Sequence, residues 1–565
     1  MRTLKMVSIG IASLVGLVIV LMVAAALFIH PNAYRARIER SVQQSTGRSL
    51  QLGGELHLAL FPSIALRFGP ASLGNPPGFP ATAFLTLRQA SLRVKLLPLL
   101  HGQLQIGHID IEGLDAQLLR NAQGQGNWQG FGAGATAATP APTVAPAGSP
   151  ATLPQIAGLT LRDARVSYQG TVLEPLNLTI GRVTEGAAVP VSLQLQLQRA
   201  AGPPIALAGS LALTYEPDGL HVSAIDLQLD QSHLSGSLAL AGASSQTVNF
   251  NLQIDRLDLD RYRSAPAKGS APATAQPSTP LQLPSTLLKS LQMQGSLLVG
   301  TLKLAGITLT QLQLQALARD GVTHLAPLAA QLYGGTFHGD ITLDARGAVP
   351  VMTTEQSLAG VDLARLLQDF EGTRRLSGSG NLSAMLHGQG SDSDALLRSL
   401  NGQVVLDVKQ GAIQGIDLPF EVGQATALLS HQAPPGGRAS GRTSFETLHA
   451  SATVHDGVAE THDLDIATQL LTVRGQGTLD LVSDEVNSQL QIALLKPPAT
   501  ASASSATLAE VPLNVTGTLS SLQVRPDLRQ LARLQLQQQL KKRGIQLPQK
   551  VQGALQGLFG GARPR

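Results

Sequence analysis

Alternation of apolar and polar residues dominates the chain after residue 30. Apolar side chains at every second position are typical of strands with one face against apolar material and the other in water. Asp320-Gly321, Asn401-Gly402 and Asp456-Gly457 favour tight turns between such segments. The pattern predicts antiparallel hairpins and meanders in a mainly β fold. The alternation is clearest over residues 191–198, 225–230, 249–255, 308–315 and 476–481.

Three segments have helical spacing instead: 34–44, 362–370 and 526–539. The last begins a basic tail, in which Leu528 and Leu531 are spaced for one helix face. Such a helix could cap the final strands with its lysines in solvent, or it could contact a membrane surface or a partner.

The first thirty residues predict a membrane anchor. Arg2 and Lys5 precede an apolar run over residues 6–29 that contains no charged residue. At about 1.5 Å per residue, such a helix reaches roughly 36 Å, enough for a hydrocarbon core of roughly 30 Å. The alternative is a cleaved signal peptide, whose apolar region is usually shorter, about 7–15 residues. Both interpretations predict that the body is exported.

Stretches rich in Ala, Pro, Gly and Thr predict flexible linkers. They divide the β-rich body into three segments that follow the anchor. The predicted organisation is a cytoplasmic tail at 1–5, a transmembrane helix at 6–29, β segments at 30–129, 155–263 and 285–525, linkers at 130–154 and 264–284, and a basic helix with its tail at 526–565.

Composition narrows the function classes. Hydrophobic residues make up 43% of the chain but aromatic residues only 3%, so the apolar face is aliphatic. The net charge is only +4, and no basic face with interleaved aromatics is present, which argues against nucleic-acid binding. Cysteine is absent, which excludes disulfides, thiol nucleophiles and cysteine-based metal sites.

Motifs for catalysis or cofactor binding are also missing from the sequence. It contains no H-E-x-x-H, P-loop or G-x-S-x-G motif. Gly378 and Gly380 lack the third glycine of a nucleotide loop and predict a turn. His455 and His462 are predicted at surface positions of paired strands, with a metal site as the alternative. Asp392 is predicted to cap the following helix. We therefore expect neither an enzyme nor a cofactor.

A long sheet with one apolar face must close, stack on a second layer or curl into a trough. Because large rings are scarce, a trough would have room for acyl chains; the alternative is an ordinary aliphatic sandwich core. Trp128 is predicted to pack at a strand end, with a contact at a groove entrance as the alternative. Candidate groove-lining residues, as examples of one face, are Leu193, Leu195, Leu197, Leu312 and Leu314.

Two blocks of the chain carry a family pattern. The first includes Thr46-Gly47-Arg48, Gly74-Asn75-Pro76-Pro77-Gly78, Ile109-Asp110-Ile111-Glu112-Gly113 and Asn127-Trp128. The second includes Leu400-Asn401-Gly402, Gly411-Ala412-Ile413-Gln414-Gly415-Ile416-Asp417-Leu418 and Pro512-Leu513-Asn514-Val515-Thr516-Gly517. In order and spacing these blocks resemble the AsmA family of bacterial envelope proteins.

The resemblance implies an inner-membrane anchor, a periplasmic body and a role in outer-membrane biogenesis. Larger relatives of the TamB type resemble bridge-like lipid carriers with an elongated, curled antiparallel β-sheet. The implied partners are the membrane, a phospholipid or another acyl-chain lipid, and outer-membrane assembly or lipid-handling proteins.

The sequence therefore predicts a non-enzymatic envelope protein that holds or transfers acyl chains in an aliphatic groove. The alternative is a scaffold or regulator of outer-membrane protein assembly that binds polypeptide, for example by strand addition at a sheet edge. An envelope hydrolase is disfavoured, because no nucleophile and base form a recognisable pattern.

Overall fold

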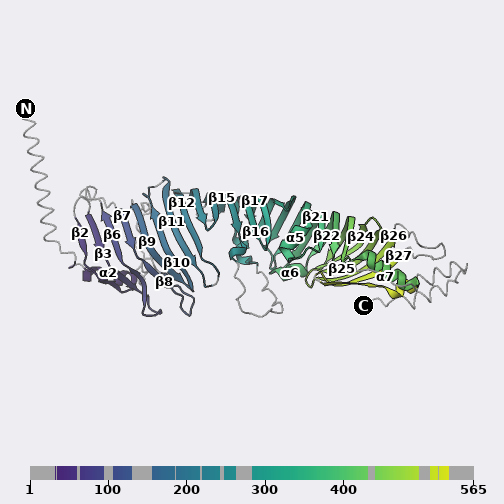
Figure 1. Ribbon diagram of the computed structural model, residues 1–565. Coiled ribbons are helices and arrows are strands. Elements are labelled where there is room, and N and C mark those ends of the chain that lie inside the picture. The colour runs from purple at the N-terminus through teal and green to yellow at the C-terminus, as the bar shows by residue number, and fades with distance from the viewer. Residues whose placement is uncertain are drawn as a thin grey trace, which may run out of the picture. The chain divides into compact units, whose positions relative to one another are not determined.

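The computed structural model describes residues 32, 35–59, 64–94, 106–129, 156–184, 186–200, 202–216, 219–241, 247–262, 283–430, 440–494, 510–519 and 521–533. These residues form 28 strands and few helices (Figure 1). The predicted anchor at 6–29, the linker at 130–154 and nearly all of the linker at 264–284 lie outside them. Among the described residues, no helix has the length and apolarity needed to cross a membrane.

The chain forms two compact units. Unit 1 comprises residues 1–256 and 261–268, and unit 2 comprises residues 257–260 and 269–565. The described strands do not form a closed sheet, because β1 and β2 in unit 1 and β28 in unit 2 each pair with one strand only. The mainly β, antiparallel prediction is confirmed.

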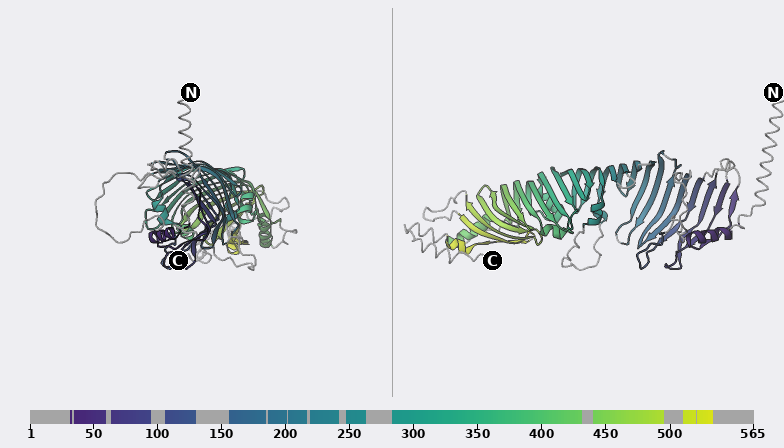
Figure 2. Two further views of the ribbon diagram at one scale, coloured as in Figure 1. Left: turned by 90° about the vertical axis from the view of Figure 1, so that its left-hand side faces the viewer. Right: turned by 180° about the vertical axis from the view of Figure 1, so that it is seen from behind.

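The first α-helix that the structure describes in unit 1 is α2 (Arg35–Thr46), at the position predicted for a helix over 34–44. Figures 1 and 2 both place α2 at one end of the short strands that follow it. The short strands are β1 (Leu50–Leu52), β2 (His57–Ala59), β3 (Ile64–Phe68), β4 (Ala71–Gly74), β5 (Ala83–Leu87), β6 (Gln89–Val94), β7 (Ile106–Glu112) and β8 (Asp115–Leu118).

These strands form two ladders that meet at one strand. The orders are β2–β3–β6–β7 and β1–β4–β5–β8, and both β7 and β8 pair with β9 (Ile156–Tyr168). The two pairings with β9 are parallel, unlike the hairpins that the sequence predicts. The long connection over residues 119–155 allows the chain to return to the same end of the sheet, which a tight turn cannot do.

The rest of unit 1 is an antiparallel meander. Each strand from β9 onward pairs with the next one in the chain. The predicted strands at 191–198, 225–230 and 249–255 lie in β11, β13 and β15. The strands are β10 (Thr171–Ile180), β11 (Val189–Gln198), β12 (Ile205–Glu216), β13 (Gly219–Leu229), β14 (Ser232–Ala241) and β15 (Thr247–Asp258).

A bulge in β13 keeps its apolar residues on one face. Val222 pairs with Leu238 and Ile225 pairs with Gly236, so Ser223 and Ala224 together oppose a single residue of β14. Ala224 has a φ of 49°, as the extra residue of a bulge often requires. The alternation in the sequence changes phase between Val222 and Ile225, and the bulge compensates for this change.

Unit 2 is an antiparallel meander with helices between some strands. Its helices are α4 (Ser285–Ser290), α5 (Leu363–Glu371), α6 (Ser393–Arg398) and α7 (Leu418–Ser430). Its strands are β16 (Met293–Leu304), β17 (Ile307–Arg319), β18 (Val322–Leu332), β19 (Gly335–Asp344), β20 (Val351–Asp362), β21 (Leu376–Gln389), β22 (Asn401–Gln414), β23 (Arg442–His455), β24 (Val458–Ala467), β25 (Leu471–Asp480), β26 (Glu485–Leu494), β27 (Glu510–Thr518) and β28 (Ser521–Pro526).

Aspartate caps define the starts of α5 and α6 in unit 2. Asp362 accepts hydrogen bonds from the backbone N–H groups of Ala364 and Arg365 at 3.0 and 3.3 Å, and Gly372 ends α5 with a φ of 73°. Asp392 accepts from the N–H of Ala395 at 2.9 Å. The helix at 362–370 and the capping role of Asp392 are confirmed.

Turn predictions are correct in part. Asp320-Gly321 and Asp456-Gly457 connect β17 to β18 and β23 to β24, with positive φ at all four residues. The predicted turns at Asn401-Gly402 and at Gly378 with Gly380 are wrong, because these residues lie in β22 and β21.

The misassigned glycines serve close packing instead. A Cβ on Gly380 would lie 2.7 Å from the side chain of Leu363, so the glycine makes room for α5 on β21. A Cβ on Gly402 would lie 2.0 Å from the carbonyl oxygen of Met385 on the neighbouring strand. Glycine is therefore required inside these strands by steric contact rather than by a turn.

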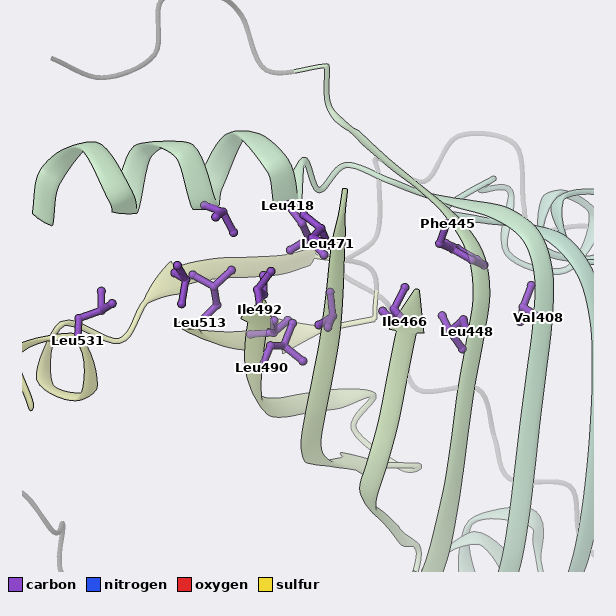
Figure 3. Close-up of a cluster of buried hydrophobic side chains, with 14 of the residues drawn as sticks. Val408, Leu418, Phe445, Leu448, Ile466, Leu471, Leu490, Ile492, Leu513 and Leu531 are labelled. Carbon is purple, nitrogen blue, oxygen red and sulfur yellow. The ribbon is translucent and has the colours of Figure 1, made fainter. Parts of the chain in front are cut away.

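A buried apolar cluster closes the sheet face at the C-terminal end of unit 2 (Figure 3). Helix α7 lies over the strands there and contributes Leu418. Asp527 caps a further helical segment at 528–533 by accepting from the N–H groups of Arg529 and Gln530, and Leu531 of this segment is buried in the same cluster. The capping interpretation fits this part of the predicted tail helix; Leu534 and the basic residues beyond it lie outside the described residues.

The packing of this cluster gives a stability prediction. Ile492 is 0% exposed, so Ile492→Val should lower the stability of unit 2 by about 1 kcal/mol through the lost methylene and the cavity it leaves. Hydrogen-exchange protection of β25–β27 measures this change. Val482→Ala, at an exposed position in the turn between β25 and β26, is the control and should change the protection little. Equal effects of the two substitutions would contradict the assignment of Ile492 to the core.

Candidate functional site

Rows of apolar side chains cross the strands of unit 1. Directly opposed residues on paired strands point to the same face of a sheet, so the strand register identifies each row. The first, the Leu193 row, consists of Phe68, Ala90, Ile111, Leu161, Leu178 and Leu193. The second, the Leu197 row, consists of Leu50, Leu73, Leu85, Ala116, Val166, Leu173, Leu197 and Ile205.

Leu195 lies between the two rows. It pairs with Leu176 of β10 and Leu207 of β12, and it shares its face with Leu193 and Leu197. The three leucines of β11 are half-buried, whereas Gln194 between them is exposed. The structure thus places these candidate residues together, within one apolar face that crosses from β3 to β12.

The candidates Leu312 and Leu314 lie in unit 2. On β17 they pair with Val299 and Leu297 of β16. Leu312 is buried and Leu314 is half-buried, while Gln313 between them is exposed. They share one face of β17, as the alternation predicts.

The apolar face is covered to different extents along the chain. Beneath α7, fifteen buried residues form one cluster. In the described part of unit 1, the buried cluster consists of Leu52, Leu56 and Ala71, and four members of the rows are buried one by one: Leu73, Ala90, Ala116 and Leu161. The leucines of β10 to β15 are mainly half-buried. The C-terminal end of unit 2 therefore has a packed core, whereas the leucine rows of unit 1 remain partly accessible to solvent.

An apolar cavity lies at the N-terminal end of these rows, beside α2. Its volume is about 300 Å³, at the lower end of ordinary ligand pockets. Among its lining residues only Ser72 is polar, and Ile38 comes from α2. Phe68 belongs to the Leu193 row, while Leu50, Leu73 and Leu85 belong to the Leu197 row. We call this cavity the α2 pocket.

Sequence reasoning did not find the α2 pocket. Its walls come from a helix and several strands of three to five residues, which are too short for alternation to reveal a common face. The spacing of Ile38 and Val42 on the predicted helix was the one available signal.

Comparison with known proteins gives the family. The model of the AsmA family matches residues 1–188 and 229–464, which is well over half of the chain. The chain belongs to the AsmA family. Protein AsmA of Escherichia coli (strain K12) is 23% identical over 589 residues, covering 92% of this chain and 93% of that protein. No solved structure matches the chain significantly.

Membership in the AsmA family confirms the resemblance that the two sequence blocks indicate. It makes the chain an envelope-associated protein of a family related to outer-membrane biogenesis. The finer expectations, of a membrane anchor and of lipid as cargo, are treated below.

Residues of the first AsmA block meet in a buried polar cluster. The side-chain amide of Asn127 donates to Asn75 Oδ1 at 2.8 Å and to the carbonyl oxygen of Gln117 at 2.7 Å. Its Oδ1 accepts from the N–H of Leu119 at 2.9 Å. Asn127 itself is 0% exposed, while its three partner residues are half-buried or exposed. We call Arg48, Asn75 and Asn127 the polar cluster.

Arg48 joins α2 to this cluster. Its Nη2 donates to the carbonyl oxygens of Asn127 and Gln129 at 2.7 and 3.2 Å, and its guanidinium carbon lies 4.8 Å from the centre of the Phe84 ring. Burial lowers the pKa of Arg48. The polar cluster therefore fixes the strands that carry the α2 pocket relative to the loop at 121–129.

Trp128 packs at a strand end. Its ring meets that of Tyr168 edge-on, with centroids 5.7 Å apart, and the Arg120 guanidinium carbon lies 5.5 Å from the indole. Arg120 Nε also donates to the Tyr168 hydroxyl at 2.9 Å. These contacts match the predicted packing role.

Histidines and carboxylates lie on the polar face of the strands. His455 pairs with Asp456 at 3.3 Å and His462 with Glu460 at 3.3 Å, all at exposed positions. Within the described ranges, no three His, Asp or Glu side chains are grouped so that they could hold a metal ion.

His449 gives a pH-dependent prediction. Its Nδ1 lies 2.7 Å from Asp407 Oδ1, and this hydrogen bond raises the pKa of His449. Because the folded pKa exceeds the unfolded value of about 6.5, the pair contributes stability below that pH and loses it as pH rises through the folded pKa. Asp407→Asn should lower the pKa of His449, which NMR titration of the ring measures.

The control for this titration is Asp465→Asn. Asp465 acts on His449 only through its charge and is the weakest of the causes that raise the pKa. An equal response to both substitutions would rule out the Asp407 hydrogen bond as the main cause.

Proposed function

We propose that this protein is a non-enzymatic, membrane-anchored envelope protein that binds phospholipid acyl chains along its leucine rows and so serves outer-membrane biogenesis. The observation that carries this proposal is the partly accessible apolar face of unit 1, which is continuous in register from Phe68 to Leu193 and from Leu50 to Ile205. Leu195 of β11 lies between the two rows. Because these residues share one face, they would together line the groove of a curled sheet.

The driving force is burial of hydrocarbon. About 25 cal/mol is gained for each Å² of apolar surface removed from water. Acyl chains gain it along the half-exposed leucines, and the aliphatic face offers no directional polar group that would select one headgroup. We therefore expect tolerance of different phospholipids. The apolar run at 6–29 supplies the anchor, which holds unit 1 at the inner membrane with the body in the periplasm.

A second candidate function rests on the sheet edges. The described edge strands β1, β2 and β28 each have one partner, so each leaves a row of backbone donors and acceptors unused by a second strand. A polypeptide could add as a further strand there. This supports the alternative of a scaffold for outer-membrane protein assembly.

Lipid analysis of the purified body separates these functions. A protease site inserted at residues 30–34 releases the body from its anchor without detergent, and mass spectrometry then identifies the bound molecules. We expect phospholipids of mixed headgroup to accompany the body. A body that carries peptide and no phospholipid would favour the scaffold.

A further inference from the structure

The α2 pocket stands at the membrane-proximal end of the leucine rows. The apolar run ends at Ile29, and α2 begins at Arg35. The connecting residues extend at most roughly 20 Å, at about 3.6 Å per residue. An anchor formed by residues 6–29 would therefore keep the pocket within reach of the phospholipid headgroups.

The chemistry of the pocket fits a single hydrocarbon chain. Its lining is apolar except for Ser72, and Ile38 is 36% exposed at the α2 side. A polar ligand would lose its hydrogen bonds to water there without finding partners, whereas a hydrocarbon chain would lose none.

Basic side chains of α2 complement a phosphate group. Arg37 and Arg40 are exposed on the helix that carries Ile38, whereas the one acidic residue of α2, Glu39, is half-buried and accepts a hydrogen bond from the N–H of Leu52 at 3.0 Å. A phospholipid that places one acyl chain beside Ile38 would bring its phosphate near this basic helix. Charge and apolarity together point to a membrane phospholipid rather than to a neutral hydrocarbon or a peptide.

We propose that the α2 pocket takes one acyl chain of an inner-membrane phospholipid and is where lipid enters the leucine rows. This inference rests on the proposed function of acyl-chain binding. Register supports the route, because Phe68 and Leu73 of the pocket lie in the same rows as Leu193 and Leu197. An acyl chain leaving the pocket therefore meets apolar side chains on each successive strand.

The test uses the full chain in vesicles of phosphatidylethanolamine and phosphatidylglycerol that contain a phospholipid with a diazirine on its acyl chain. After irradiation at successive times, mass spectrometry locates the labelled peptides. We expect label near Ile38 and Leu73 first and on β10–β12 later. Ile38→Glu places a carboxylate at the pocket and should slow labelling of β10–β12 about fivefold or more. Gln43→Glu, on the other side of α2, should slow it less than about twofold.

Each result decides a separate point. If β10–β12 are labelled as fast in Ile38→Glu as in Gln43→Glu, the pocket is not the entry site. Acyl-chain binding by the rows is then unaffected. If β10–β12 are never labelled in the parent chain, the proposed function fails too. If a photoreactive residue at position 38 crosslinks to residues 6–29 and not to lipid, the chain itself fills the pocket and the inference is overturned. Trp128 fluorescence during unfolding verifies that both variants remain folded.

Discussion

Replacing Asn127 by Ala should destabilise unit 1 by about 3 kcal/mol or more. The substitution removes three hydrogen bonds made by a side chain that is 0% exposed. It takes their partner from the N–H of Leu119, the carbonyl of Gln117 and Asn75 Oδ1, and each lost hydrogen bond at this partly buried site costs about 1 kcal/mol.

Trp128 is a convenient probe for this prediction. It is the only tryptophan in the chain and follows Asn127 directly, so its fluorescence during denaturant unfolding reports on unit 1 alone. Gln123→Ala, at an exposed position in the same loop, is the control and should leave the midpoint nearly unchanged. A similarly small shift for Asn127→Ala would mean that the polar cluster does not hold this end of the sheet.

Replacing Leu195 by Asp should reduce the phospholipid bound to the protein by about tenfold or more. A carboxylate between the two leucine rows either loses its hydration to an acyl chain or keeps the chain away, and burial of an unpaired charge is strongly unfavourable. Because Leu195 is half-buried and not fully buried, the carboxylate can reach water in the lipid-free protein, so we expect the sheet to remain folded.

The matched variant is Gln194→Asp, one residue away on the opposite face. It adds the same charge to the same strand at an exposed position, and the bound lipid should stay near the parent level. Quantitative lipid mass spectrometry measures both variants, with Trp128 unfolding as the test of fold. Equal lipid loss in the two variants would show that overall charge matters, and that the side of the sheet does not.

Local patterns predicted most elements of this fold. Alternation identified β11, β15 and β17, and the helical spacing over residues 362–370 identified α5, because these signals depend on neighbouring residues. The change of phase between Val222 and Ile225 even contained the signal for a bulge. The glycines of β21 and β22 were misread as turns, since their role depends on strands and helices distant in sequence.

Long-range features could not be predicted in this way. Arg48 and Asn127 meet across 79 residues, and nothing in either local segment indicates the other. The parallel pairing of β9 depends on a crossover whose direction has no local signature. The α2 pocket could not be predicted either, because it forms only when β1, β3, β4, β5 and α2 come together. The leucines of β11 were found as a face, but their continuity with the pocket comes from register alone.

Site-specific photocrosslinking in cells tests the central claim most directly. A photoreactive amino acid is placed in the full chain at Leu195 or Leu314, which are half-buried, and at the matched exposed neighbours Gln194 and Gln313. The account predicts that phospholipid is crosslinked from both leucine positions and from neither glutamine position. Crosslinking from the glutamine positions alone, or from no position while the protein supports envelope assembly, would contradict acyl-chain binding on this face.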